Sequence, residues 1–304
     1  QFANGDYSVT GDVGIEDIAP RPVCSTANGR HGSMVNPRYG QTQGFDSRSG
    51  QYILASCKTP PFPLLSGDSL ISTVSLPAPQ GKVYLDTAAI LTVTAKPVTA
   101  NEFRPPYTQN PAERASRRAS NDSLYKQSDI NWSLLPSLRR PPNTPLISIS
   151  EAAFQKPCIG EHYPGFENRA WRPRENCPDY GYDISRQVSE AALQLMLDYT
   201  NEEKEKLLVN FLQFGLDLWG IPDAGGSWSA GSGEPEGRKW PLLFSKIMLD
   251  INKNLKYNYR NQYGELIYYF QEDEQTYAFN DPELPACAKF NPAGKPVESA
   301  CNEP

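Results

Sequence analysis

The spacing of hydrophobic residues differs between the first and the later parts of this chain. Before residue 100, short apolar or β-branched runs are separated by Pro, Gly, Ser and Asp, which is typical of strands joined by turns. The clearest runs are Tyr52–Ser56, Ser69–Ser75 and Ala88–Ala95. Residues 1–100 are therefore predicted to form an irregular β-rich domain.

Residues 183–256 follow a helical period instead. Two apolar stripes meet at Thr200-Asn-Glu-Glu203, a capping box in which the hydroxyl and the carboxylate satisfy N–H groups at a helix start. We predict an antiparallel hairpin of helices over about 185–199 and 201–219, with Gly220 and Pro222 ending the second helix. A third helix is predicted to begin at Pro241, and its apolar face contains Phe244, Ile247, Met248, Ile251 and Leu255.

Two further segments have less regular patterns. Prolines recur through residues 101–182, and because proline fixes φ and lacks an N–H, long helices and central strands are not expected there. This connection is predicted to wrap across the surface. Residues 257–304 begin with many aromatic residues and end in loop, and Glu265–Phe270 is either a short strand or a buried turn. The predicted fold class is α+β.

The overall charge narrows the range of partners. The chain has 304 residues and a net charge of −6 at pH 7, which argues against nucleic acid, because phosphate binding needs a concentrated positive face. No apolar run is long enough to span a bilayer. No nucleotide-binding loop, zinc signature or serine-nucleophile motif occurs, so neither a cofactor nor a metal is predicted.

The cysteines point to an oxidising compartment. Six of them fall into three local pairs, predicted as the disulfides Cys24–Cys57, Cys158–Cys177 and Cys287–Cys301. The acceptor patterns at Asn121 and Asn131 are compatible with glycosylation, and an N-terminal Gln is compatible with signal-peptide removal. The protein is therefore predicted to be secreted, extracellular or periplasmic.

The first candidate site is the glycine-rich acidic loop before the third helix. A glycosidase needs two carboxylates beside the scissile bond, and Glu234 and Glu236 are the catalytic candidates. Trp228, Arg238 and Lys239 are candidate substrate-binding residues, because aromatic faces stack on sugars and helix starts offer unpaired N–H groups. The alternative is that these charges are solvated or pair with one another.

The second candidate set lies in the proline-rich connection. A lyase needs a base that abstracts the proton α to a uronate carboxylate, and His162 and Tyr163 are the candidates. Arg172 is the candidate for binding the carboxylate and Trp171 the candidate for stacking on the sugar. The alternative is that Trp171 and the arginines hold the connection against the helices.

Several segments resemble one group of large secreted bacterial proteins, mostly uncharacterised, with an N-terminal β-region and an α/α-toroid-like helical region. The matching segments are, in chain order, Phe103–Tyr107, Tyr199–Leu208 with Phe211–Gly220, and Gly237–Phe244 with Glu272–Tyr277. Order and approximate spacing also match, so the resemblance covers roughly residues 30–280. This chain departs from the group in lacking a His just before Gly237 and in being shorter.

Toroids of this kind occur in polysaccharide lyases and some glycosidases. The resemblance therefore implies a partial α/α-toroid-like helical layer and a secreted carbohydrate-active protein, with a polysaccharide or glycan as partner. The other interpretation is a non-catalytic, self-assembling extracellular structural or glycan-binding protein. Because the three helices present more apolar surface than one hairpin buries, we also predict a homo-oligomer or polymer, with residues 1–20 as an arm that reaches a neighbour.

Overall fold

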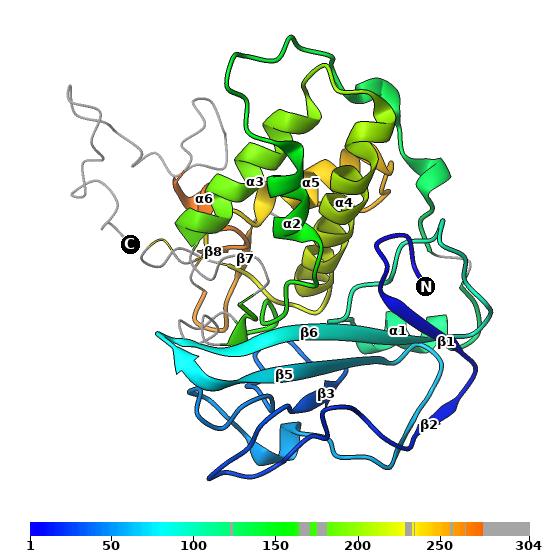
Figure 1. Ribbon diagram of the computed structural model, residues 1–304, viewed down its shortest axis with the longest axis vertical. Coiled ribbons are helices and arrows are strands. Elements are labelled where there is room, and N and C mark those ends of the chain that lie inside the picture. Colours follow the sequence, from blue (N-terminus) through cyan, green and yellow to red (C-terminus); the bar gives the residue numbers. More distant parts are fainter. Residues whose placement is uncertain are drawn as a thin grey trace.

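The computed structural model describes residues 1–121, 124–163, 171–174, 181–228, 233, 235–255, 258–264 and 266–275. A β-layer formed by the N-terminal part lies against a helical layer formed by the later part (Figure 1). Strands and helices are both present, which confirms the α+β class. Within these ranges, no helix combines the length and the apolar character needed to cross a membrane.

The β-layer is built on a four-stranded sheet with the order β1-β6-β5-β3. Its strands are β1 (Tyr7–Thr10), β3 (Ser33–Val35), β5 (Ser69–Gln80) and β6 (Val83–Thr94). The apolar runs predicted as strands lie in β5 and β6, which form a long antiparallel ribbon, and β1 pairs parallel to the end of β6. A separate two-stranded sheet pairs β2 (Val13–Ile15) with β4 (Phe62–Leu64).

The two faces of the β5–β6 ribbon have different surroundings, because successive residues of a strand point to opposite sides. Ile71 and Ile90 face a core cluster that also contains Met34 and Trp171. Leu70 belongs to a second, smaller cluster, which β2 and β4 cover at one end of the ribbon. Residues further along this second face of the ribbon do not belong to the cluster.

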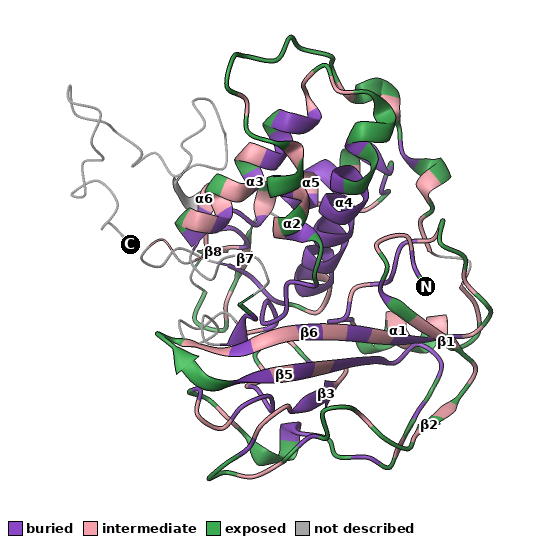
Figure 2. Ribbon diagram, viewed as in Figure 1, coloured by how far each residue is buried: buried purple, intermediate pink, exposed green. Residues whose placement is uncertain are grey.

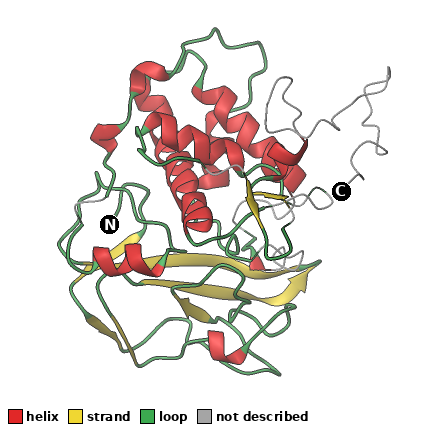
Figure 3. Cartoon of the chain, turned by 180° about the vertical axis from the view of Figure 1, so that it is seen from behind, coloured by secondary structure: helices red, strands yellow, loops and turns green. Residues whose placement is uncertain are grey.

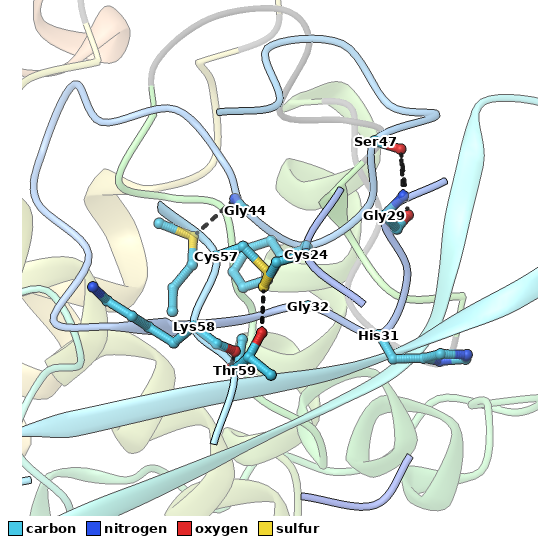
Figure 4. The surroundings of a disulfide bond; sticks show 12 residues. Cys24, Gly29, His31, Gly32, Gly44, Ser47, Cys57, Lys58 and Thr59 are labelled. Atoms are coloured by element: carbon cyan, nitrogen blue, oxygen red, sulfur yellow. Dashed lines mark hydrogen bonds between the residues drawn. A yellow bond between two sulfur atoms is a disulfide. The ribbon is translucent and has the colours of Figure 1, made fainter. Parts of the chain in front are cut away.

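The loops between β2 and β5 are held by the disulfide Cys24–Cys57, whose Cα atoms are 5.7 Å apart (Figure 4). This confirms the first predicted pair. Thr59 donates its hydroxyl to Cys24 Sγ at 3.0 Å beside the bridge. Cys158 is also disulfide-bonded. Its expected partner, Cys177, lies outside the described residues, as does the pair Cys287–Cys301.

The predicted strand over Tyr52–Ser56 is wrong. Leu54–Ser56 form the 3-10 turn η1, which leads directly into Cys57. Ile53 and Leu54 are exposed, so this apolar run has no core to face. The run has no alternation of apolar and polar residues, so its sequence alone could not distinguish a strand from a turn. Here the neighbouring disulfide holds the turn.

The N-terminal segment is fixed onto its own chain. Phe2 is buried, and Ala3 N–H donates to Glu102 O at 2.8 Å. Asp6 Oδ2 accepts from Arg104 Nε at 2.6 Å, and β1 follows directly. The predicted arm that reaches a neighbour is therefore wrong, because strand pairing and burial hold this segment in place.

The helical layer lies on one side of the sheet, as the view from behind also shows (Figure 3). Its elements are α2 (Ile147–Phe154), α3 (Gly181–Leu195), α4 (Asn201–Asp223), α5 (Lys239–Met248) and α6 (Gln271–Gln275), with the 3-10 turns η2 (Gln127–Asp129) and η3 (Trp132–Leu134). The short helix α1 (Pro111–Arg117) lies beside the sheet instead (Figure 1). Every residue of α4 from Leu207 to Pro222 is buried (Figure 2). A helix that contacts α2, α3 and α5 needs apolar residues all round, which explains why α4 has two adjacent apolar stripes.

The capping box is confirmed. Thr200 Oγ1 accepts from Glu203 N–H at 3.2 Å, and Glu203 Oε2 accepts from Thr200 N–H at 2.8 Å. The helix does not end at Gly220, however, and Pro222 lies inside its last turn. The Ala224 N–H caps the Gly220 carbonyl at 3.1 Å, so the terminal turn closes without the missing proline donor.

Two segments expected to be irregular contain short elements. The helices α1 and α2 lie in the proline-rich connection. Both are short, so they agree with the expectation that long helices do not form there. β8 (Leu266–Tyr268) pairs antiparallel with β7 (Asn258–Arg260), so Glu265–Phe270 contains the strand rather than the buried turn. The toroid-like arrangement of the helices stays a prediction.

Candidate functional site

The two predicted sets of site residues meet in one buried cluster around Glu161. Arg172 Nη2 pairs with Glu161 Oε1, and Arg238 Nε donates to Glu161 Oε2 at 3.2 Å. Each of these three residues is no more than 2% exposed, and the neighbouring His162 is fully buried. Glu161, His162, Arg172 and Arg238 are termed the arginine centre below.

The start of α5 places Arg238 in this centre. Gly237 has a φ of +88°, and a Cβ on it would lie 2.7 Å from the backbone nitrogen of Ser185 in α3. On the other side, a Cβ on Gly215 in α4 would lie 2.3 Å from Pro241 O. The Gly-Arg-Lys-Trp-Pro motif therefore enters α5 in close contact with two helices, and Arg238 is buried at the N-cap position.

The acidic segment at α6 holds the start of α5 from the other side. Glu272 Oε1 accepts from Gly237 N–H at 2.9 Å, and Lys239 pairs with Asp273. Gln271 Nε2 donates to Glu236 Oε1 at 2.9 Å. A carboxylate on unpaired N–H groups at a helix start is stabilising, so Glu272 has a clear structural role here.

Aromatic rings pack beside the arginine centre. The Trp171 ring lies 5.7 Å from the His162 ring and 5.0 Å from the Tyr163 ring, with interplanar angles of 31° and 34°. The Trp171 Nε1–H donates to Gly50 O at 3.2 Å, which fixes the indole against the β-layer. Trp171 is buried and Tyr163 is half-buried, so Tyr163 is the more accessible ring of this group.

The charges of the centre follow from its burial. Burial alone would raise the pKa of Glu161, but the charges of Arg172 and Arg238 outweigh it and lower that pKa to about 2. Burial lowers the pKa of His162 to about 4, which the Glu161 charge opposes only in part. Burial also lowers the pKa of Arg238, against the effect of Glu161. At neutral pH the centre therefore contains a carboxylate, a neutral imidazole and two guanidinium groups.

Several polar atoms of the centre have no hydrogen-bond partner among the described residues. These atoms are Nε and Nη1 of Arg172 and both ring nitrogens of His162. A buried donor that stays unpaired costs roughly 1–3 kcal/mol, and more when it is charged, so an acceptor placed beside Arg172 would be stabilising. The cluster is positively charged overall and offers donors at Arg172, which suits a carboxylate.

The cluster does not fit the two-carboxylate chemistry of a glycosidase. Both oxygens of Glu161 are engaged by guanidinium groups and its pKa is low, so it is not available as a general acid. Glu236 is half-buried with its carboxylate bound to Gln271, and Glu234 lies outside the described residues. In the described part of the chain, no group of three or more His, Cys, Asp and Glu is placed to hold a metal ion.

The remaining predicted residues are placed apart from the centre. Trp228 is buried against Phe270, with ring centroids 5.5 Å apart, so it is a core residue. Asn121 is half-buried, and its Nδ2 donates to Lys96 O at 2.6 Å. Asn131 is exposed, which leaves it the more accessible of the two predicted glycosylation positions.

Sequence reasoning missed Glu161 and Arg104. Arg104 is a second buried arginine, and its Nη1 and Nη2 donate to the two carboxylate oxygens of Asp217 at 2.9 and 2.6 Å. The available signal was the carboxylate directly before His162 in a segment with several arginines. The spacing of residues along the chain did not reveal the role of Glu161, because Glu161 pairs with Arg238 at the start of a helix that is distant in sequence.

Comparison with known proteins gives no relative: no protein-family model, curated protein or solved structure matches this chain.

Proposed function

We propose that the protein is a secreted carbohydrate-active protein that recognises an acidic polysaccharide at the arginine centre. The observation that supports this is that Nε and Nη1 of buried Arg172 have no acceptor among the described residues. A uronate carboxylate is an anionic acceptor, and guanidinium N–H groups form strong charge-assisted hydrogen bonds with such groups. The disulfides are in keeping with a location outside the cytoplasm.

The same cluster holds the groups that a lyase-type elimination needs. His162 is neutral at physiological pH, and neither of its ring nitrogens has a partner among the described residues, so it is the base that takes the proton α to the carboxylate. Arg172 neutralises the charge that develops on the carboxylate. The electron pair left at the α-carbon forms the double bond to the β-carbon as the bond from the β-carbon to the glycosidic oxygen breaks. Half-buried Tyr163 donates its phenolic proton to the departing oxygen.

Binding of defined polysaccharides tests this proposal. We expect the protein to bind and cleave a polyuronate, with an unsaturated uronate product detected by its ultraviolet absorbance, and Arg172→Gln to abolish both. Arg186→Gln is the matched control, because Arg186 lies exposed on α3 and, within the described part of the chain, forms an ion pair only with Glu190, at 3.3 Å. Equal polyuronate binding by Arg172→Gln and the parent would overturn the proposal.

Self-assembly is the second candidate function, and exposed apolar side chains favour it. Leu146, Ile149 and Leu193 are exposed by 71%, 61% and 63%. The start of α2 lies beside the end of α3, since Gln194 Nε2 donates to Pro145 O at 3.2 Å. Light scattering at micromolar concentration tests it: we expect an oligomer that Leu193→Glu converts to a monomer, and a strictly monomeric parent protein would exclude it.

A further inference from the structure

A groove of about 590 Å³ lies on the second face of the β5–β6 ribbon, away from the cluster that contains Trp171. Binding sites for small molecules enclose roughly 300–1,000 Å³, so this groove is large enough for a ligand. Its floor comes from β5 and β6, and its walls come from the segments 4–7, 15–19 and 155–157. It is therefore distinct from the arginine centre.

The register of the sheet explains the hollow. Tyr7, Leu91 and Leu70 form one row across the ribbon, because Tyr7 pairs with Leu91 and Leu91 with Leu70. The next two rows on the same face are Ala89 with Ser72 and Thr87 with Val74. Rows on one face are about 6.7 Å apart, and β1 does not extend over the later rows. The floor thus changes from bulky to small side chains where β1 is absent.

The walls of the groove contain both apolar and polar side chains. Asn4 and Gln155 offer amide groups, Asp17 offers a carboxylate, and Lys156 an ammonium group. Tyr7 stands at one end with 52% of its surface exposed. The hydroxyls of Ser72 and Thr87 lie in the floor, so donors and acceptors are present on every side.

We propose that this groove binds an extended, neutral segment of an oligosaccharide. Planar amides and carboxylates bind sugar hydroxyls in pairs, and the exposed ring of Tyr7 provides a face on which a sugar stacks. The carboxylates of the lining are already paired, Asp6 with Arg104 and Asp17 with Arg21, so the groove has no concentrated charge that would favour an acidic chain.

The proposal does not rest on the arginine centre, since that centre lies on the opposite side of the ribbon. The two sites would recognise different chemistry, with a neutral segment on the sheet and an acidic sugar at Arg172. Ligand binding at the groove and ligand binding at the arginine centre can therefore be abolished separately by mutation.

Isothermal titration calorimetry with neutral hexasaccharides of glucose, xylose and mannose, and with an acidic hexuronate, tests the groove. We expect at least one neutral hexasaccharide to bind. Ala89→Phe, which fills the floor, should weaken that binding at least tenfold, and so should the milder Tyr7→Ala. Tyr263→Ala is the control, because Tyr263 is 78% exposed in the turn between β7 and β8.

The outcomes of this experiment are distinct. Loss of neutral binding in both groove variants, with Arg172→Gln and Tyr263→Ala unchanged, supports the groove. Unchanged neutral binding in Tyr7→Ala and in a folded Ala89→Phe overturns it. A parent protein that binds none of the neutral hexasaccharides also overturns it, whatever its affinity for the hexuronate. Melting temperatures establish that each variant is folded.

Discussion

Glu161 and Arg238 are 77 residues apart in the sequence, yet Arg238 Nε donates to Glu161 Oε2 at 3.2 Å in the interior of the protein. Arg172 pairs with the other oxygen of the same carboxylate. One carboxylate thus links the proline-rich connection to the start of α5. The interaction that supports the proposed site is therefore also a structural link between two parts of the chain.

Replacing Glu161 by Gln should strongly destabilise the fold. The substitution leaves Arg172 and Arg238 buried without a counter-charge, and breaking a buried ion pair costs about 3–5 kcal/mol. Urea unfolding followed by circular dichroism measures the change. Glu190→Gln is the control, because Glu190 pairs with Arg186 on the surface and exposed pairs contribute about 0–1 kcal/mol. Equal losses of unfolding free energy in the two variants would show that the buried ion pairs of Glu161 contribute no more to stability than an exposed ion pair.

Stability should fall as the pH falls below neutral. The pKa of His162 is lowered from 6.5 to about 4, so the unfolded chain binds a proton that the folded chain does not between these values. The resulting loss is on the order of 3 kcal/mol as the pH falls from 6.5 to 4. The pKa of Glu161 is lowered from 4.5 to about 2, so its contribution is present above pH 4.5 and is lost towards pH 2.

His162→Phe isolates the first of these two effects. Phenylalanine keeps an aromatic ring beside Trp171 but cannot take up a proton. The free energy of unfolding of the variant should depend less on pH between 4 and 6.5 than that of the parent protein, whereas the loss below pH 4.5 should remain. Identical pH profiles across the upper window would contradict the lowered pKa of His162.

Thr200→Ala should cost about 1 kcal/mol of stability, because it removes the hydroxyl that accepts from Glu203 N–H at the start of α4. Thermal unfolding of the variant measures it. Thr144→Ala provides a comparison, since the Thr144 hydroxyl donates to Pro141 O in an exposed loop. A smaller effect for Thr200→Ala than for Thr144→Ala would argue against the capping box as a stabilising element.

The features that sequence predicted are those with a local cause. The capping box uses residues three positions apart, and the strand character of β5 and β6 follows from their β-branched runs, whereas their pairing was not predicted. The position of Glu161 has no such local signal, because its partner Arg238 belongs to another element. Likewise, Pro222 remains helical only because it lies in a terminal turn that Ala224 caps.

The motifs that suggested a ligand loop also have a structural explanation. Glu272 caps the start of α5, Gln271 binds Glu236, and Gly237 contacts α3 closely. A motif shared by order and spacing can therefore reflect packing as well as chemistry. Sequence reasoning named Arg238 and Arg172 as candidate substrate-binding residues, but their common partner is visible only in three dimensions.

Gly220→Ala gives a test in which two physical effects have opposite signs. In an ordinary helix interior, alanine is more stable than glycine by about 1 kcal/mol, so the substitution would normally stabilise α4. Here a Cβ on Gly220 would lie 2.0 Å from Thr108 O and 2.6 Å from the Pro106 side chain. The backbone of the connection must move away from α4, and overpacking of this kind typically costs 1–3 kcal/mol. We therefore expect net destabilisation in urea unfolding. Gly14→Ala is the matched control, because its Cβ would meet only the flexible end of Glu16. A more stable Gly220→Ala variant would show that the connection does not pack tightly against α4.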